Sequence, residues 1–303
     1  LLGENKFLLM EGSYRLLARK DSLVEAKPRS LLRVAPSFRF SPMEKLTLTA
    51  GLLFAYENDT IGGDSDFHLY PHIQASYQLG KTVQAFAHLK GDMEEVSLHR
   101  LARENNWVNA NLHIFNANKQ LDFTAGLAGR VGTSLAFQLG GAVASYQHLY
   151  FYINNTERPE KFDALYDNVT RTSAFAEWGI EKGSRASLKM RAEYFGYSMD
   201  TQAEAWHRPV YKVAAYSYFN LFSKIQLHAN AVALGGMKAW NEVLGRAETL
   251  DAAIDLNVKA RYFVSKDFSC FVEGSNLLSA NYPLYLNYPV RGLQVTGGIS
   301  WSF

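Results

Sequence analysis

The sequence RGLQVTGGISWSF, residues 291–303, alternates apolar and small or polar side chains up to its last residue. Leu293, Val295, Ile299, Trp301 and Phe303 fall on one side of this alternation. Because successive side chains of a strand point to opposite faces, the stretch predicts a strand with one apolar and one polar face. A soluble sandwich would bury the apolar face in a core, whereas a terminal Phe with a Trp two residues before it also fits a strand that ends at a membrane interface. We expect the chain to end in an outer membrane.

Composition favours one membrane domain built from strands. Aromatic residues make up 14% of the 303 residues, with 17 Tyr and 19 Phe, and Tyr and Trp favour the lipid headgroup level. Mean hydropathy is −0.17, and no apolar run approaches the roughly 20 residues of a membrane helix. The chain has no linker-like tract, so residues 1–303 are expected to form a single outer-membrane β-barrel domain with no plug domain within the chain.

The same two-residue period recurs along the chain, most clearly in residues 67–79, 186–194, 225–233 and 250–262. We expect an all-β fold, a transmembrane antiparallel up-and-down β-barrel of about 14 strands. The expected strand centres are residues 12, 35, 51, 73, 88, 125, 141, 175, 191, 214, 230, 256, 273 and 297. An even number of strands puts both termini on the same side, which we expect to be the periplasm.

The connections between these strands are alternately short and long. The short ones are expected near residues 41–44, 80–81, 131–133, 181–184, 222–223 and 264–267. The long ones are expected near residues 20–29, 57–66, 96–119, 154–167, 200–208, 240–249 and 281–289. Short periplasmic turns and long extracellular loops are typical of bacterial outer-membrane barrels.

Aromatic residues gather beside the short turns and predict an interfacial girdle. Trp178, Tyr262, Trp301 and Phe303 are its main members, and the last two also form the expected insertion signal. In lipid, backbone groups must be paired, so we expect residues 8–16 to pair with residues 293–303 and close the barrel.

Several segments carry a resemblance to a known family. They are Asn276-Leu277-Leu278, the run NYPVRGLQV at residues 287–295, the final GGISWSF, and the loop segments at residues 103–107 and 202–206. Together they resemble TonB-dependent-receptor-like outer-membrane barrels of Bacteroidota over roughly residues 100–303. The resemblance implies an outer-membrane protein grouped with receptors that import scarce nutrients. It fits either the C-terminal barrel portion of such a receptor or a plugless relative.

The polar faces of the strands give the candidate functional surface. The charged residues expected to face the lumen are Arg33, Arg39, Lys45, Lys90, Asp122, Arg130, Glu177, Lys189, Arg191, Glu193, Lys224, Asp251, Asp255, Lys259, Arg261 and Glu273. Mixed signs favour cross-strand ion pairs. The small basic excess either biases a pore toward anions or belongs to a mesh that supports the wall. The loop at residues 96–119 is long enough to fold inward.

The sequence offers little support for a catalytic site or a metal site. His68 and His72 stand roughly 13 Å apart if both lie on one strand, so they cannot share a metal without a third element. The sequence contains no Gly-x-Ser-x-Gly elbow or HExxH pair. We expect no enzyme, no cofactor and no metal site. Cys270 is expected to be a small apolar residue of a strand face.

We therefore predict a barrel in the bacterial outer membrane that serves passage or receptor-type uptake of a small solute. The alternative is a structural or accessory barrel that docks partner proteins through its long external loops. The expected partners are the lipid bilayer, the barrel-assembly machinery and, in the alternative, other outer-membrane or surface proteins. A net charge of +2 with scattered basic residues argues against a nucleic-acid partner.

Overall fold

The computed structural model describes residues 6–18, 28–58 and 65–303. One α-helix, α1 (Leu98–Glu104), accompanies eighteen strands in this part of the chain. The strands are β1 (Phe7–Leu17), β2 (Arg29–Met43), β3 (Leu46–Asn58), β4 (Ser65–Gln78), β5 (Val83–Glu94), β6 (Ala117–Val131), β7 (Leu135–Asn154), β8 (Phe162–Lys182), β9 (Ala186–Met199), β10 (Tyr211–Leu221), β11 (Ile225–Gly235), β12 (Lys238–Asn241), β13 (Arg246–Thr249), β14 (Ala253–Phe263), β15 (Phe268–Ser275), β16 (Pro283–Tyr285), β17 (Tyr288–Pro289) and β18 (Gln294–Trp301). Among the described residues, no helix is long and apolar enough to cross a bilayer.

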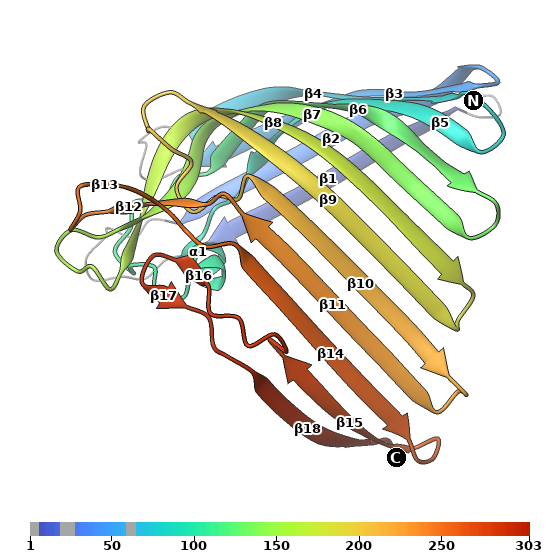
Figure 1. The fold of residues 1–303 in the computed structure, drawn as a ribbon. Coiled ribbons are helices and arrows are strands. Elements are labelled where there is room, and N and C mark those ends of the chain that lie inside the picture. The colour runs from blue at the N-terminus through green and yellow to red at the C-terminus, as the bar shows by residue number, and fades with distance from the viewer. Residues whose placement is uncertain (1–5, 19–27, 59–64) are drawn as a thin grey trace.

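Fourteen of these strands form one antiparallel up-and-down sheet. Its order follows the chain from β1 to β11 and continues through β14 and β15 to β18. Each of the fourteen strand centres expected from the sequence falls inside one of these strands. The sheet curls into the wall of a barrel, with its short turns at one end and its long loops at the other (Figure 1). The expected fold class is confirmed, and we refer below to the short-turn end and the loop end.

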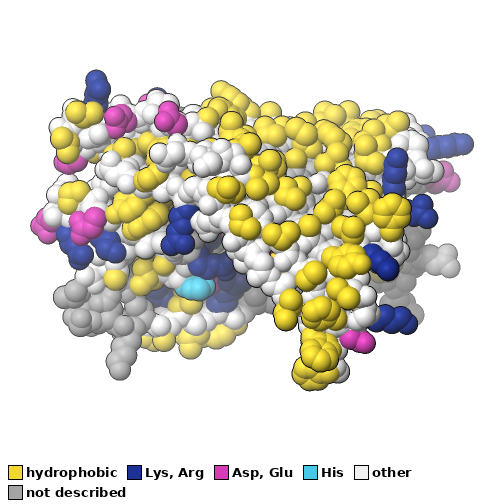
Figure 2. Space-filling model, turned by 60° about the horizontal axis from the view of Figure 1, so that its bottom comes forward, with side chains coloured by type: hydrophobic (Ala, Val, Ile, Leu, Met, Phe, Trp, Pro, Cys, Tyr) yellow, Lys and Arg dark blue, Asp and Glu magenta, His cyan; other side chains and the backbone are white. Residues whose placement is uncertain are grey.

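The register separates polar from apolar side chains row by row. One cross-strand row reads Arg39, Thr49, Gln74, His88 and Thr124, and its neighbour reads Phe38, Ala50, Ile73, Leu89 and Phe123. Residues that face each other across an antiparallel pair lie on the same side of the sheet. Ile73 and Phe123 are 42% and 46% exposed, and hydrophobic side chains cover much of the outer surface in Figure 2. The apolar rows therefore form the convex face and the polar rows the concave face.

The two edge strands have one partner each. β1 is hydrogen-bonded to β2 and β18 to β15, and no β1–β18 pairing is found among the described residues. Met10 and Ile299, from the two edges, are 72% and 73% exposed. The expected closure of residues 8–16 on residues 293–303 thus stays a prediction.

Tight turns close the hairpins at the short-turn end. Between β10 and β11, Phe222 and Ser223 both have positive φ, 53° and 57°, and Lys224 N–H donates to the Leu221 carbonyl at 3.1 Å. Positive φ at both central residues matches the right-handed twist of the flanking strands. Lys45 and Lys224 lie in such turns rather than within strands, because each turn ends one residue later than the sequence predicts.

The long connections contain more structure than expected. Residues 96–119 include α1 and the start of β6, residues 240–249 include parts of the β12–β13 hairpin, and residues 281–289 include β16 and β17. The expected loop at residues 154–167 shrinks to residues 155–161, because residues 162–167 pair with β7. The expected loops at residues 20–29 and 57–66 lie largely outside the described residues.

The expected strand at residues 250–262 begins later, at Ala253. Leu250 is instead buried in a cluster with Met237, Ala239 and Leu286. This packing draws the chain out of the sheet, so Asp251 lies in the connection before β14.

Candidate functional site

Ion pairs cross the concave face between β8 and β9. The Glu177 carboxylate lies 3.0 Å from Lys189 Nζ and 3.3 Å from Arg191 Nη1, and Arg191 Nη2 lies 2.8 Å from Glu193. Further along the same face, between β14 and β15, Lys259 Nζ lies 2.8 Å from Glu273. The pairs of Glu177 with β9 and of Lys259 with Glu273 join neighbouring strands, as cross-strand pairs of opposite charge do, whereas Arg191 and Glu193 both lie on β9.

The other charged residues expected from the sequence are spread along the wall. Arg33 lies 3.1 Å from Asp92, and Asp122 lies 3.7 Å from Lys119 and opposite Lys90 in the register. Arg130, Arg39 and Arg261 line three separate hollows of about 810, 240 and 510 Å³. Asp255 accepts a hydrogen bond from Asn257 at 2.9 Å. The structure therefore groups these residues into several small clusters and not into one site.

The loop end holds a more compact arrangement, built around residues 95–116, which we call the mouth strap. Its helix α1 is capped at its N-terminus by Ser97, whose side chain accepts the Arg100 N–H, and at its C-terminus by Asn105, whose N–H donates to the Leu101 carbonyl. Both caps satisfy backbone groups that a seven-residue helix leaves unpaired. Leu101 is fully buried, so one side of this short helix is fixed by packing.

Three buried polar residues attach the mouth strap to β2 and β3. Arg29 donates to the Val96 carbonyl at 2.7 Å and to Asn116 Oδ1 at 2.8 Å. The Asn116 amide group in turn donates to the Glu57 carboxylate. Arg29 and Glu57 are each 8% exposed, and charge-assisted hydrogen bonds are the stronger kind. Both ends of the strap are thus held to one flank of the wall.

Glu104 connects the mouth strap to the opposite flank. Its carboxylate accepts the Tyr150 hydroxyl at 2.6 Å and the Tyr152 hydroxyl at 3.3 Å, and its backbone carbonyl accepts the Tyr285 hydroxyl at 2.8 Å. The ring of Trp107 lies 4.0 Å from that of Tyr288. Figure 1 shows α1 beside β16 and β17, inside the curve of the sheet. The strap therefore joins the β7–β8 hairpin to the connection between β15 and β18.

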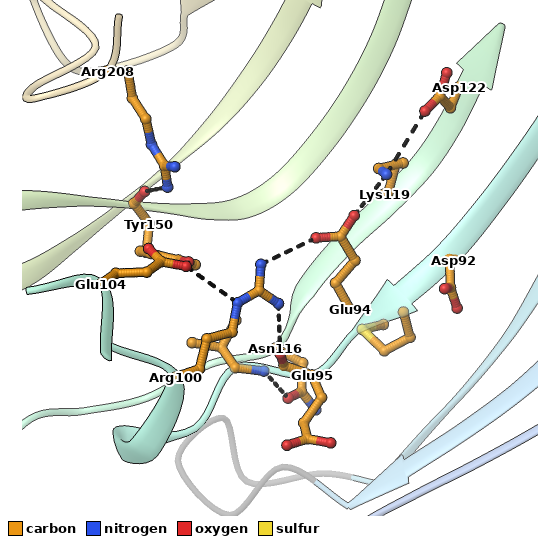
Figure 3. Close-up of polar contacts among 12 residues, drawn as sticks. Asp92, Glu94, Glu95, Arg100, Glu104, Asn116, Lys119, Asp122, Tyr150 and Arg208 are labelled. Carbon is orange, nitrogen blue, oxygen red and sulfur yellow. Dashed lines mark hydrogen bonds and ion pairs between the residues drawn. The ribbon is translucent and has the colours of Figure 1, made fainter. Parts of the chain in front are cut away.

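Arg100 bridges the acidic residues beside the strap (Figure 3). Its guanidinium lies 3.7 Å from Glu94 and 3.4 Å from Glu104, and it donates to the Glu95 carbonyl at 2.8 Å. Glu94 is also 2.6 Å from Lys119 Nζ. Arg208 lies 4.9 Å from the centroid of the Tyr150 ring and donates to the Tyr150 carbonyl at 2.8 Å. Positive and negative charges in this network are closely balanced, which favours a structural role in holding the strap in place.

His207 fixes a third contact at the loop end. Its ring nitrogens lie 2.9 Å from the Tyr152 carbonyl and 3.3 Å from the Leu286 N–H. An Nδ1–H tautomer satisfies both contacts, since Nδ1 then donates and Nε2 accepts. Burial lowers the pKa of His207 to about 4, although the Tyr152 carbonyl acts in the other direction. The neutral ring joins three segments: the β7–β8 hairpin, the β9–β10 loop and the β15–β18 connection.

Arg100, Glu104, Tyr150, His207 and Arg208 were missed as site residues by the sequence reasoning. One local signal was present: the run LYFYI at residues 149–153 breaks the two-residue alternation. An uninterrupted apolar run predicts a segment buried on both faces. The polar partners of this run lie 46 and 58 residues away in sequence, so spacing could not identify them.

The expected girdle residues lie toward the short-turn end. Trp178, Tyr262 and Trp301 are 36%, 43% and 74% exposed, and Phe303 is fully exposed beyond β18. Trp301 faces Phe268 in the register. Their role in insertion stays a prediction.

No protein-family model matches the chain, and no curated protein matches it. Several solved structures match it. One is the pyoverdine outer membrane receptor FpvA from Pseudomonas aeruginosa PAO1, which is 13% identical and has a TM-score of 0.66. The match covers 91% of this chain and 42% of the receptor chain. The ferric-catecholate import receptor Fiu from K12 E. coli has 10% identity, a TM-score of 0.66 and coverage of 91% and 45%.

The siderophore receptor PirA from Pseudomonas aeruginosa has 13% identity, a TM-score of 0.63 and coverage of 100% and 53%. This chain thus spans about half, or less, of the receptors that it matches. The three matches are named as receptors and not as enzymes. At these identities they establish the shared fold: that of outer-membrane β-barrel receptors.

Proposed function

We propose that this chain forms the wall and the strapped mouth of an outer-membrane barrel that takes up a small solute in the manner of a receptor. The loop end would face outward and both termini the periplasm, in line with the sidedness of outer-membrane barrels. The polar concave face would be the lumen, and the charged residues named above would line it. No catalytic step is assigned to any residue.

The mouth strap is the observation that supports uptake by a receptor over free diffusion. A diffusion pore needs an open entrance, whereas this strap packs against both flanks through Glu104, Arg29 and an apolar cluster that includes Val96, Leu101 and Phe162. A covered mouth requires a solute to displace or pass the strap. The shared fold with siderophore receptors supports the same proposal.

Single-channel conductance in a planar bilayer tests it. The folded chain would be compared with a variant in which residues 98–114 are replaced by a short Gly-Ser linker, because this removes the strap and keeps Asn116. We expect little or intermittent conductance from the unaltered chain and a steady increase from the variant. Glu104→Gln, which weakens the attachment to the two tyrosines, should give an intermediate result.

Steady, high conductance of the unaltered chain would show a diffusion pore and contradict the receptor proposal. Equal conductance of both proteins would show that the strap does not cover the pathway. Failure of either protein to enter a bilayer, despite a β-type circular dichroism spectrum in detergent, would contradict the membrane assignment altogether.

One observation favours the alternative of an accessory barrel. Val243 and Leu244, at the tip of the β12–β13 hairpin, are 94% and 51% exposed. Contiguous exposed apolar surface marks sites of contact with another protein, and these two residues are adjacent in the chain. Stoichiometric co-purification of a partner in mild detergent, lost on replacing both residues with Ser, would support this alternative. A partner-free monomer would contradict it.

A further inference from the structure

We propose that the hollow between β2 and β5 on the concave face is a binding site for a small oxyanion, such as phosphate. Six of its lining residues carry hydrogen-bonding side chains: Arg39, Thr47, Thr49, Gln74, Ser76 and His88. Such an anion would be the solute of the uptake proposed above. Only the claim that the anion is transported rests on that function.

The register brings the donors together. Arg39 faces Thr49, Thr49 faces Gln74, and Gln74 faces His88, so four donors from four strands stand in one row. Thr47 and Ser76 face each other two residues nearer the short-turn end. Guanidinium, amide and hydroxyl groups all donate to oxygen, and a histidine ring donates through at least one nitrogen. The row is fixed by the sheet itself, so its donors are arranged before a ligand arrives.

The charge of the hollow is unbalanced. Arg39 Nε donates to Thr49 Oγ1 at 3.2 Å, and no carboxylate of the described residues lies within ion-pair distance of its guanidinium. None of the described residues that line the hollow is acidic. The nearest acidic residue in the register, Asp122, accepts from the Thr124 hydroxyl at 3.0 Å and lies 3.7 Å from Lys119. A cation with only a neutral partner leaves room for an anion as its counter-charge.

The larger hollow between β11 and β15 serves as a comparison. It also contains an arginine, Arg261, and a histidine, His228, but Glu273 lies within it and is paired with Lys259 at 2.8 Å. A resident carboxylate already supplies negative charge there. The volumes also differ, about 240 Å³ against 510 Å³, and the smaller hollow suits a solute smaller than a drug-sized ligand.

Isothermal titration calorimetry with inorganic phosphate tests the site on the folded chain in detergent. Ionic strength would be held constant with sodium chloride, so that simple screening is separated from binding. We expect saturable binding at one site, weakened about tenfold or more by Arg39→Gln, since a charge-assisted hydrogen bond is lost. Arg39→Lys keeps the charge without the planar fork and should retain part of the affinity.

Arg191→Gln is the matched control, because it removes the same group from the same face where Glu177 and Glu193 already neutralise it. Its phosphate affinity should stay within about twofold of the unaltered chain. Thr49→Val offers a second disruption of the hollow if Arg39→Gln does not fold.

Absence of saturable binding, or equal affinity of the Arg39→Gln and unaltered proteins, would overturn the site and leave the proposed uptake function untouched. An equal loss of phosphate affinity in Arg191→Gln would show that binding follows the overall charge of the wall. That result would also overturn the proposed site. Binding that depends on Arg39, in a chain that fails the conductance test, would establish the site while contradicting the function.

Discussion

The β7–β8 hairpin contains two regions that differ although they share the same two strands. In its lower part, toward the short-turn end, exposure alternates along residues 168–178 of β8, and Leu139 and Val143 of β7 are 46% and 48% exposed. In its upper part, toward the loop end, exposure is at most 4% for Tyr150, Phe151 and Tyr152. Phe151 packs in a cluster with Tyr146 and Trp206, whereas its two neighbours pack against the mouth strap.

The difference comes from what covers each face. The lower hairpin has an apolar face turned outward and a polar face turned to the concave side. Its apolar and polar residues therefore follow a two-residue period. The upper hairpin is covered on both faces by loops, and its local burial resembles the core of a soluble protein. Substitutions should therefore cost much more in the upper hairpin than in the lower one.

Phe151→Ala should have the largest effect. Replacing a fully buried phenylalanine with alanine lowers the free energy of unfolding by about 3–5 kcal/mol. The packing lost here lies at the loop end. Urea titration followed by tryptophan fluorescence would measure it, since Trp206 lies in the same cluster. Leu139→Ala is the control and should cost about 0.5 kcal/mol or less. Equal costs at the two positions would contradict the division between wall and loop end.

Acidification should loosen the loop end before the wall. The pKa of His207 is lowered to about 4 by burial, from an ordinary value of 6.5, so the folded state favours the neutral ring. Its stabilising contribution is fully present above pH 6.5 and is lost as the pH falls toward 4, by about 3 kcal/mol at 1.36 kcal/mol per pKa unit. The groups packed around the ring are Phe162, Tyr285, the Tyr152 carbonyl and the Leu286 N–H.

Limited proteolysis of the strap between pH 7 and pH 4 would detect this loosening. His207→Gln removes the titrating group, so cleavage of that variant should vary much less with pH. The same pH dependence in both proteins would assign the effect to other residues.

Arg191→Gln should change stability little. Its ion pairs with Glu177 and Glu193 lie on a partly exposed wall, where such pairs contribute about 0–1 kcal/mol. The temperature at which the folded band is lost in unboiled gel samples would measure it. A loss comparable to that of Phe151→Ala would mean that the concave wall is as tightly packed as the loop end.

Deletion of Phe303 should have the smallest effect on the finished sheet. The side chain is fully exposed and lies beyond β18, so few contacts are lost. We expect slower appearance of the folded form in cells, because the terminal aromatic would act during insertion. A pulse-chase comparison would measure the rate, and unchanged assembly would contradict the role of an insertion signal.

Local periodicity made the fourteen strands and their turns predictable. Side chains at i and i+2 share a face whatever the partner strand is, so residues 186–194 or 225–233 reveal their strands without tertiary information. The strand predicted at residues 250–262 was too long, because the burial of Leu250 depends on Met237, at the far end of the same connection, and on Leu286 from another loop. It also missed β16 and β17, which are only three and two residues long.

The sequence by itself determined the wall: its strand count, its polar and apolar faces, and the ends at which short and long connections lie. The tertiary structure alone decided the mouth, where Glu104 contacts Tyr150 and Tyr285. It also decided the hollow, which Arg39 and His88 line from different strands. The reason is physical. A strand's two faces follow from its own backbone geometry, whereas the partners of a loop carboxylate or an arginine depend on register and packing between segments far apart in the chain.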